Sequence, residues 1–411
     1  MKVLYVTGSC LTKNTSANMS HNGYVQGLLE NGADLDIIMA SDSWGEADNK
    51  LKRWEGVRYF EYNSVSFADR IRERAKKFIP QPKAENTLPK SNSNSKSQHK
   101  EKAKAKFSAR ALAKKFFYSI FKPDPVYPLN ATWLKNASKF VSAIEYDLVV
   151  SNSSPSASHK IVELLANKGR IRYKRWVQIW EDPWYHDLYG GHSEQIKQEE
   201  HNLLRAGQEI YYVSPLTTHY QKIFFADCGH KMNNIPLPFL AFGEETTQVS
   251  TDVSFGYFGD YYSFTRNLQP FYDAICATKS KCYIYGDSDL NLASCGNTIV
   301  SGRVTLDVLE EVQNRTSVLV HLCNLRGGQI PGKIYHYSAT TKPILFILDG
   351  TEEEKQIIKE YFTQYDRYYF CDNNKDDIEQ AIRELSQNYA NHTGRIIEEF
   401  CPKSVVAQLF Q

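Results

Sequence analysis

A loop with three glycines, followed directly by a lysine, is the first stretch of this sequence whose residue types suggest chemistry. It spans residues 324–332 and lies between an apolar stretch and a short helical pattern that begins near Pro331. Gly327, Gly328 and Gly332 have no side chain, so the backbone N–H groups there can approach a ligand closely. Such a loop at the start of a helix is typical of an anion-binding site.

Lys333 strengthens this interpretation. A cation in the first turn of a helix opposes the helix dipole, at a cost of about 0.3–1 kcal/mol. A bound diphosphate would reverse the sign of that interaction. The alternative is a solvated lysine that simply tolerates the cost.

Acidic residues follow another apolar stretch, residues 175–182. If this stretch is a parallel strand, Glu181 and Asp182 lie at its carboxyl end, where ligands bind in open α/β sheets. Asp182 precedes a proline, so an ordinary Asp-Pro turn is the alternative.

The carboxyl end of the first predicted strand should face the same cleft. Gly8 and Ser9 follow that strand, and we expect them to contact a ligand. His159 and His186 are more typical of helix-packing or surface histidines.

The elements that position these residues form two α/β series. Short apolar strands alternate with helical patterns, which predicts parallel sheets. A polar stretch near residues 243–252 separates the series. We therefore expect a first Rossmann-like domain over residues 1–245, a second over 250–390, and a C-terminal helix over 391–411 that packs back towards the first.

One segment interrupts the first series. Residues 70–122 contain 16 Lys and Arg against three acids, a net charge of +13, so the rest of the chain carries −11. Residues 80–106 are rich in Ser, Asn and Lys, which predicts disorder, and basic amphipathic helices flank them. The segment is interpreted as a solvated insertion or as an element that binds an anionic membrane surface. Neither its pattern nor the fold supports nucleic-acid binding.

The overall composition, 42% hydrophobic and 23% charged, is that of a soluble protein. No apolar run approaches the roughly 20 residues of a membrane span, and no signal peptide is recognisable. The eight cysteines form no CxxC pair. We expect a cytoplasmic protein with reduced thiols and no structural metal.

Longer motifs resemble a known family. The segment 318–347 resembles the nucleotide loop of GT-B glycosyltransferases, particularly the family 4-like bacterial enzymes of surface-polysaccharide synthesis. The segments 123–165 and 175–190 are similar to the core of their acceptor domain, and 256–268 to the first strand of their donor domain. The similarity covers about three quarters of the chain and excludes residues 80–106.

The resemblance implies site roles. Arg266, beyond Gly259, is the basic residue expected to reach the diphosphate, and the glycine loop and Lys333 hold the diphosphate and ribose. His336 stands where the family has a glutamate that binds the ribose hydroxyls. Asp182 would orient the acceptor hydroxyl or the donor sugar, and Glu181 stands where the family often has an arginine.

The resemblance implies transfer of a sugar from a nucleotide-diphosphate sugar, UDP- or GDP-linked, to a glycan acceptor. We expect this acceptor to be lipid-linked, and the transfer to retain configuration and to need no metal. The acid pair Asp287 and Asp289 resembles the metal-binding pattern of GT-A enzymes, but it falls in a loop of the second series. A GT-B nucleotide-sugar epimerase and a non-catalytic partner subunit, the latter suggested by His336, are the alternatives.

Overall fold

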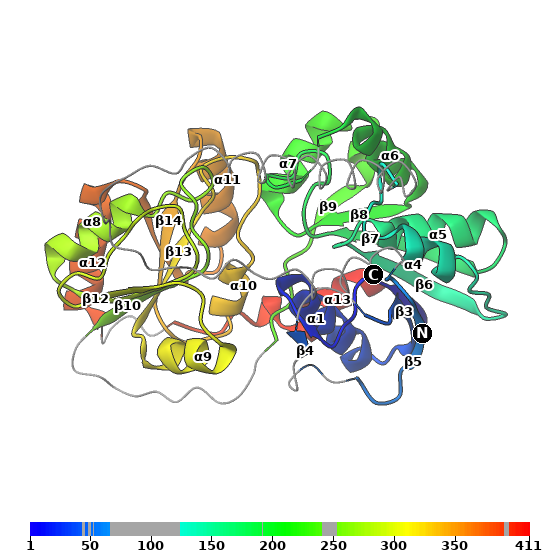
Figure 1. The fold of residues 1–411 in the computed structure, drawn as a ribbon, viewed down its shortest axis with the longest axis horizontal. Coiled ribbons are helices and arrows are strands. Elements are labelled where there is room, and N and C mark those ends of the chain that lie inside the picture. The colour runs from blue at the N-terminus through cyan, green and yellow to red at the C-terminus, as the bar shows by residue number, and fades with distance from the viewer. Residues whose placement is uncertain are drawn as a thin grey trace, which may run out of the picture.

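Two parallel sheets, one in each half of the chain, organise the structure (Figure 1). The computed structural model describes residues 1–42, 46–47, 51, 53–65, 124–190, 192–240, 253–389 and 394–411. The basic segment 70–122 and the predicted boundary at 243–252 both lie outside the described residues.

The first domain contains a seven-stranded sheet in the order β5-β3-β1-β6-β7-β8-β9. Its strands are β1 (Lys2–Val6), β3 (Asp34–Ala40), β5 (Arg58–Tyr62), β6 (Glu145–Asn152), β7 (Arg172–Trp180), β8 (Glu209–Tyr212) and β9 (Met232–Asn234). Its helices are α1 (Ser16–Glu30), α4 (Ala131–Ala137), α5 (Ala157–Asn167), α6 (Glu194–Ala206) and α7 (Pro215–Phe224). A short antiparallel pair, β2 (Lys13–Asn14) and β4 (Glu46–Ala47), lies beside the sheet.

The second domain contains a six-stranded sheet in the order β12-β11-β10-β13-β14-β15. Its strands are β10 (Ser254–Phe258), β11 (Lys281–Tyr285), β12 (Thr298–Ser301), β13 (Val318–Leu322), β14 (Ile344–Leu348) and β15 (Tyr368–Asp372). Its helices are α8 (Gln269–Thr278), α9 (Leu306–Arg315), α10 (Lys333–Tyr337), α11 (Glu352–Thr363) and α12 (Lys375–Gln387). The strand order reverses between β10 and β13, so their carboxyl ends form a crevice of the kind in which α/β sheets bind ligands.

The strands are apolar because helices cover both faces of each sheet. Every residue of β10, β13 and β14 is buried. This double burial explains why the strands were recognisable in the sequence as short continuous apolar runs.

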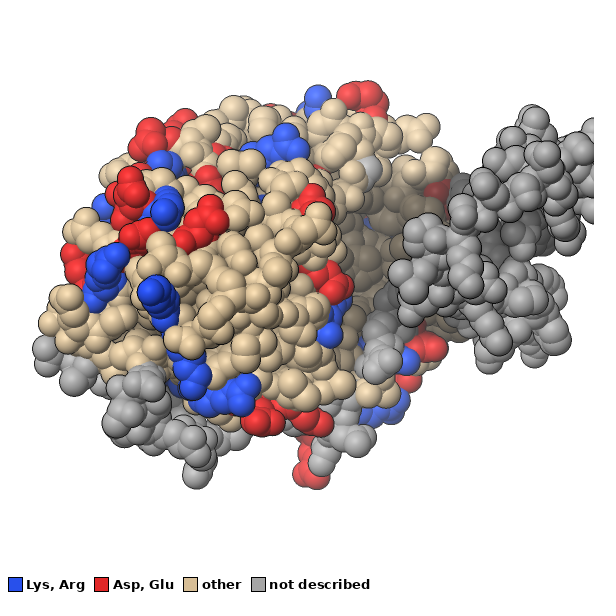
Figure 2. Space-filling view, turned by 60° about the vertical axis from the view of Figure 1, so that its left-hand side comes forward, with Lys and Arg blue, Asp and Glu red and all other residues tan. Residues whose placement is uncertain are grey.

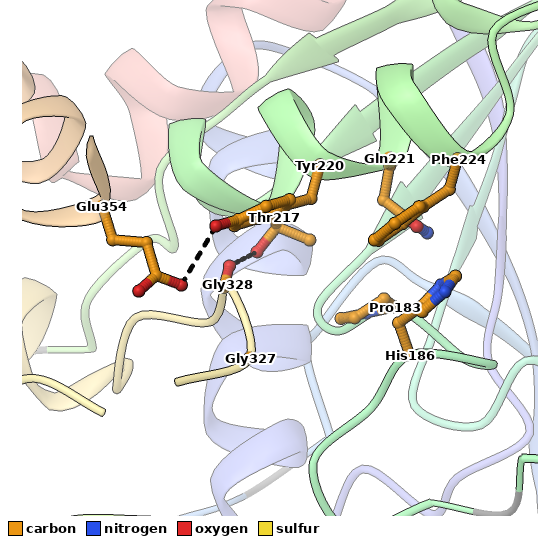
Figure 3. Close-up of a pocket in the computed structure, with 9 residues that line it drawn as sticks. All are labelled: Pro183, His186, Thr217, Tyr220, Gln221, Phe224, Gly327, Gly328 and Glu354. Carbon is orange, nitrogen blue, oxygen red and sulfur yellow. Dashed lines mark hydrogen bonds between the residues drawn. The ribbon is translucent and has the colours of Figure 1, made fainter. Parts of the chain in front are cut away.

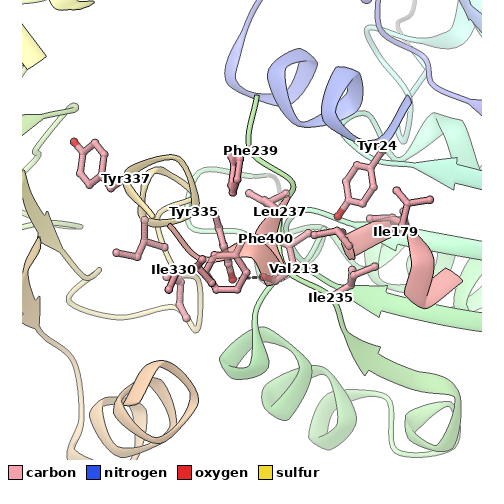
Figure 4. Packing of buried hydrophobic residues seen from close by; sticks show 14 of the residues in the cluster. Tyr24, Ile179, Val213, Ile235, Leu237, Phe239, Ile330, Tyr335, Tyr337 and Phe400 are labelled. Carbon is pink, nitrogen blue, oxygen red and sulfur yellow. Dashed lines mark hydrogen bonds between the residues drawn. The ribbon is translucent and has the colours of Figure 1, made fainter. Parts of the chain in front are cut away.

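An apolar core runs between the two domains without a break (Figure 4). Leu237 and Phe239, in the segment after β9, belong to the same cluster as Ile330 and Tyr335 of the second domain. The Tyr335 hydroxyl donates a hydrogen bond to the carbonyl oxygen of Val213, at 2.7 Å. The glycine loop and α10 are therefore anchored to the first domain as well as to their own sheet.

The C-terminal segment returns to the first domain, where α13 (Pro402–Ala407) packs against α1 (Figure 1). The packing is close, because a Cβ atom at Gly27 would clash with the Pro402 carbonyl. The segment is not the single helix that its pattern predicts. Two 3-10 turns, Glu398–Phe400 and Gln408–Phe410, flank α13, and Pro402 starts a new helix because it cannot continue one.

One further expectation was wrong. Cys276 and Cys295 form a disulfide, whereas we expected only reduced thiols. The N-cap of α1 is Thr15, because the Thr15 hydroxyl accepts the hydrogen bond from the Asn18 amide, at 3.1 Å. None of the helices in the described ranges has the length and apolar character that a membrane crossing needs.

Candidate functional site

The glycine loop leaves β13 and turns towards the first domain. Gly327 and Gly328 adopt left-handed φ angles of +97° and +71°, which residues with a side chain rarely adopt. A Cβ atom at Gly327 would clash with Leu188, and one at Gly328 would lie 2.6 Å from Cδ2 of Tyr220. These glycines therefore let the loop approach the first domain closely, in addition to keeping its backbone accessible.

A small hollow at the carboxyl ends of β10 and β13 combines several predicted residues. We call it the basic pocket. It is lined by Tyr257, Phe258, Gly259, Arg266, Val320, His321, Leu322, Pro331, Lys333 and Tyr337. A Cβ atom at Gly259 would lie 3.7 Å from Cε of Lys333, so the absence of a side chain keeps space beside the ammonium group. The fold thus brings together Gly259, Arg266 and Lys333, which lie up to 74 positions apart in the sequence.

Lys333 is the most unusual charge in the basic pocket. Its side chain is open to the cleft, yet the crowded surroundings desolvate the ammonium group and lower its pKa to about 8. Asp260 opposes this shift, whereas Arg266 adds to it. Within the described part of the chain, the ammonium group has no hydrogen-bond or ion-pair partner. An anionic ligand would supply the missing counter-charge.

Arg266 is held in place by its neighbours. Its Nε donates to Oδ1 of Asn324, at 2.8 Å, and its Nη1 donates to the Asp260 carbonyl, at 3.1 Å. The Asn324 amide in turn donates to the carbonyl oxygen of Gln329, at 3.0 Å. The guanidinium group is therefore fixed relative to the glycine loop before any ligand binds.

The basic pocket is a local feature and not part of a large positive surface. On the face shown in Figure 2, where the second domain comes forward, Lys and Arg are interspersed with Asp and Glu over a mostly uncharged surface. Arg303, for example, is paired with Asp260 and Asp287. On this face, therefore, the described Lys and Arg residues do not gather into one large positive patch.

Gly332 and His336 belong to the short helix α10. A Cβ atom at Gly332 would lie 2.8 Å from Cδ1 of Leu237, so this glycine permits the contact with the first domain. Burial lowers the pKa of His336 to about 4, and the nearby Lys333 adds to the shift. The imidazole is therefore neutral at physiological pH and keeps one nitrogen that can accept a hydrogen bond.

Asp182 faces the glycine loop from the end of β7. Its Oδ1 accepts a hydrogen bond from Nε2 of Gln329, at 2.5 Å, and the same nitrogen lies 3.2 Å from Oδ1 of Asp187. The Leu188 amide donates to Oε1 of Gln329, at 3.1 Å. Burial raises the pKa of Asp182 to about 6, and the Gln329 hydrogen bond opposes that shift. Gln329, which the sequence analysis did not identify, therefore links the glycine loop to the acidic wall of the cleft.

Glu181 is more deeply placed than Asp182. Burial raises its pKa well above the usual value, and the adjacent Asp182 adds to the shift. Its Oε1 is buried without a hydrogen-bond partner among the described residues. The surroundings therefore favour the neutral carboxylic acid, which can donate a proton or a hydrogen bond.

Solved structures with a similar architecture span the whole chain. A glycosyltransferase from Rickettsia africae matches 100% of this chain and 96% of its own, with a TM-score of 0.50 and 13% identity. An alpha-glucosyltransferase in complex with UDP and a 13-mer DNA containing a central A:G mismatch matches 100% of this chain and 98% of its own, with a TM-score of 0.53 and 11% identity. The chain has the GT-B fold.

A third GT-B structure agrees with this assignment. An E. coli protein bound to UDP-2-fluoro glucose, named for trehalose-6-phosphate, matches 99% of this chain and 96% of its own, with a TM-score of 0.53 and 11% identity. No protein-family model matches the chain, and no curated protein sequence matches it. At these identities the similarity establishes the fold and not the activity.

Gly8 and Ser9 lie at the carboxyl end of β1 as predicted, but neither lines the basic pocket. The Gly8 amide donates to Oγ of Ser158, at 2.9 Å, and a Cβ atom at Gly8 would lie 2.7 Å from Cγ of Pro155. The Ser9 hydroxyl donates to Oδ1 of Asn18, at 2.5 Å. Close packing and internal hydrogen bonds therefore account for both residues.

His159 and Asp289 both have structural roles. His159 is buried, lies 2.8 Å from the Ser151 hydroxyl, and has a pKa lowered to about 3 by burial, as expected for a core histidine. Both carboxyl oxygens of Asp289 accept hydrogen bonds from Ser263, at 2.7 and 2.6 Å, which gives this acid a structural role.

Proposed function

We propose that the protein is a glycosyltransferase that moves a sugar from a nucleotide-diphosphate sugar, UDP- or GDP-linked, to a glycan acceptor. The observation that carries the proposal is Lys333: a desolvated cation without a partner, beside Arg266 and the bare backbone of Gly259. A diphosphate bound there would meet two positive charges already positioned in a GT-B cleft.

Sugar transfer would develop negative charge on the leaving diphosphate, next to Lys333 and Arg266. The bond between the anomeric carbon and the diphosphate oxygen breaks, and its electron pair leaves with the diphosphate. Lys333 and Arg266 stabilise that developing charge, as a preorganised electrostatic site does. These groups take the place of a metal ion, so we propose metal-independent transfer.

The acceptor hydroxyl forms the new bond on the face from which the diphosphate departs, and its proton passes to the departing phosphate oxygen. Configuration is thereby retained. Asp182 orients the acceptor hydroxyl from the opposite wall, and the neutral Glu181 donates a hydrogen bond to the bound substrate. His336 accepts a hydrogen bond from the ribose, and Gly8 and Ser9 complete the substrate contacts once the ligand is present.

Closure of the cleft is part of this proposal. Gln329 bonds to Asp182 and Leu188, and the Thr217 hydroxyl donates to the Gly328 carbonyl, at 2.8 Å. These contacts hold the two domains together over the loop. They would exclude water and limit hydrolysis of the donor.

The basic segment 70–122, with its net charge of +13, supports a further part of the proposal. We propose that it binds the anionic cytoplasmic face of a membrane, where a lipid-linked acceptor for surface-polysaccharide synthesis would be found. Flotation of the full chain with vesicles containing phosphatidylserine, but not with phosphatidylcholine alone, is the expected result. Equal binding to both vesicles would contradict it.

Calorimetry without metal tests the central proposal. UDP, GDP, ADP and CMP are titrated into the wild type, Lys333→Ala and the matched control Lys359→Ala, which removes an exposed lysine of α11. Micromolar binding of one nucleotide by the wild type and the control, lost in Lys333→Ala, is the expected result. Absence of binding by any nucleotide would overturn the proposal and favour a non-catalytic partner subunit. Conversion of the donor sugar without an acceptor would instead identify an epimerase.

A further inference from the structure

A second cavity lies between α7 and the turn after β7, and we call it the aromatic pocket (Figure 3). Its volume is about 240 Å³, below the roughly 300–1,000 Å³ of sites that enclose drug-sized ligands, so it has room for one ring. It is lined by Pro183, His186, Thr217, Tyr220, Gln221, Phe224, Gly327, Gly328 and Glu354. Both domains therefore contribute to it.

Three nearly parallel rings give this cavity flat apolar faces. His186 stacks on Phe224 with ring centroids 3.7 Å apart and an angle of 15°, and Phe224 is inclined by 14° to Tyr220, at 6.0 Å. Phe224 remains 43% exposed although it is a large apolar side chain. An exposed ring in a concave site is available to pack against a ligand.

Polar atoms without partners lie among these rings. The Gln221 side chain is 1% exposed, and its Nε2 donates to Oε1 of Glu200 and to the Tyr212 hydroxyl. Its Oε1 accepts no hydrogen bond from any described residue, and Nδ1 of His186 is likewise buried without a partner. Buried polar atoms normally have hydrogen-bond partners, so these two atoms are available to bond the hydroxyl groups of a ligand.

The charge of the lining excludes one class of ligand. Glu354 lines the aromatic pocket with an acidic side chain, whose oxygens accept hydrogen bonds from the Tyr220 hydroxyl and the Thr351 amide. None of the lining residues named above is Lys or Arg. A phosphate or a uronate would therefore be repelled without compensation, whereas an uncharged ligand would not.

We propose that the aromatic pocket binds an uncharged pyranose ring of the acceptor. The apolar face of the ring packs on Phe224, and its hydroxyls donate to Oε1 of Gln221 and bond to Nδ1 of His186. The inference rests on the proposed function. The glycine loop connects the two sites, because Gly327 and Gly328 line the aromatic pocket whereas Pro331 and Lys333 line the basic pocket.

The test uses ligand-observed saturation-transfer NMR with the full chain, in the presence and absence of UDP. The probes are the methyl glycosides of glucose, galactose, mannose and N-acetylglucosamine, with methyl glucuronide as the anionic counterpart. At least one neutral glycoside is expected to bind the wild type, and methyl glucuronide is not.

Three variants locate the binding. Phe224→Ala should weaken it about 3- to 10-fold, the equivalent of one aromatic contact. His186→Phe keeps a stacked ring but removes the nitrogen, so it should weaken binding less. Ile223→Ala, at an exposed neighbour on α7 that does not line the cavity, should leave it unchanged.

Absence of binding by all four neutral glycosides, or binding that Phe224→Ala leaves unchanged, would overturn the inference. Stronger binding of the glucuronide than of the glucoside would also overturn it. Calorimetry with nucleotides separates this failure from failure of the proposed function, because Phe224→Ala should bind the nucleotide as well as the wild type does.

Discussion

The two walls of the cleft carry opposite charges but respond to burial in the same way. On the second domain, desolvation lowers the pKa of Lys333 to about 8. On the first domain, desolvation raises the pKa of Asp182 to about 6 and that of Glu181 well above its usual value. Desolvation thus shifts each wall towards its uncharged form.

The two walls differ in the kind of ligand group that would stabilise their charged side chains. A diphosphate would stabilise the charged form of Lys333, whereas beside Asp182 it would raise the carboxyl pKa further. A hydroxyl group suits the acidic wall, because a carboxylate accepts its hydrogen bond. We therefore propose that the leaving group lies on the second domain and the attacking group on the first.

Removal of the unpartnered cation should have the largest effect. We expect Lys333→Ala to lower the rate of sugar transfer by about 100- to 1,000-fold, the usual consequence of losing one group that stabilises a developing anion. Transfer is measured by release of the nucleotide diphosphate in the presence of acceptor. If the variant instead transfers sugar at a rate within about threefold of the wild-type rate, Lys333 does not stabilise the leaving group, and the second domain does not hold it.

On the opposite wall, Asp182→Asn keeps the shape of the side chain and its contact with Gln329 but removes the negative charge. We expect transfer to fall about 100-fold, at the lower end of the range for a positioned carboxylate. Nucleotide affinity should be unchanged, because the donor diphosphate lies on the other wall. Calorimetry and rate measurements on the same variant separate the two effects, and loss of nucleotide binding would contradict the assignment.

The pH dependence of kcat/KM should show the ionisation of one group on each wall, Asp182 and Lys333. Transfer needs Asp182 ionised and Lys333 protonated, so kcat/KM should fall as the pH drops below about 6 and as it rises above about 8. Each limb should change about tenfold per pH unit. Lys333→Arg should remove the alkaline limb, since arginine stays protonated. An alkaline limb that persists in this variant would belong to another group.

The bond between the walls should make a smaller contribution. Gln329→Ala removes the hydrogen bond to Asp182, worth about 0.5–1.5 kcal/mol, so we expect a 3- to 10-fold loss in kcat/KM. That hydrogen bond also lowers the pKa of Asp182, so the acid limb should move to higher pH in the variant. An acid limb at its original position would mean that Gln329 does not stabilise the ionised carboxyl group.

Glu181→Gln should have the smallest effect, and it concerns stability. The folded protein holds the Glu181 proton more tightly than the unfolded chain does, so this residue lowers stability as the pH rises above the unfolded value of about 4.3. The variant should therefore melt at a higher temperature than the wild type at pH 8 but not at pH 4. Thermal melts at both values test this, and equal differences would contradict burial as the cause.

The sequence predicted the basic pocket, whose residues follow strands of a single sheet, better than it predicted the contacts between the two domains. β10 and β13 are adjacent strands, so a glycine and a cation that follow each of them meet at one edge. The two α/β domains were likewise predictable, because doubly covered strands appear as short apolar runs, whereas the GT-B architecture was implied by the resemblance of longer motifs.

Features between the domains left no such pattern. Gln329 is one polar residue among several in its loop, and only the relative position of the two domains shows that it bonds to Asp182. The residues of α7 that line the aromatic pocket look like part of an ordinary amphipathic helix. The Cys276–Cys295 pair spans 19 positions without a motif, and the pKa shifts depend on burial that a sequence does not show.

The return of α13 onto α1 has a consequence for the order in which the protein acquires its structure. During synthesis, α1 leaves the ribosome early, whereas α13 follows only after the whole of the second domain. Until then the surface around Gly27, shaped to fit the Pro402 backbone, has nothing to cover it. The first domain therefore completes its packing after the second has been made, and the nascent chain must protect that apolar surface for the time it takes to translate residues 253–389.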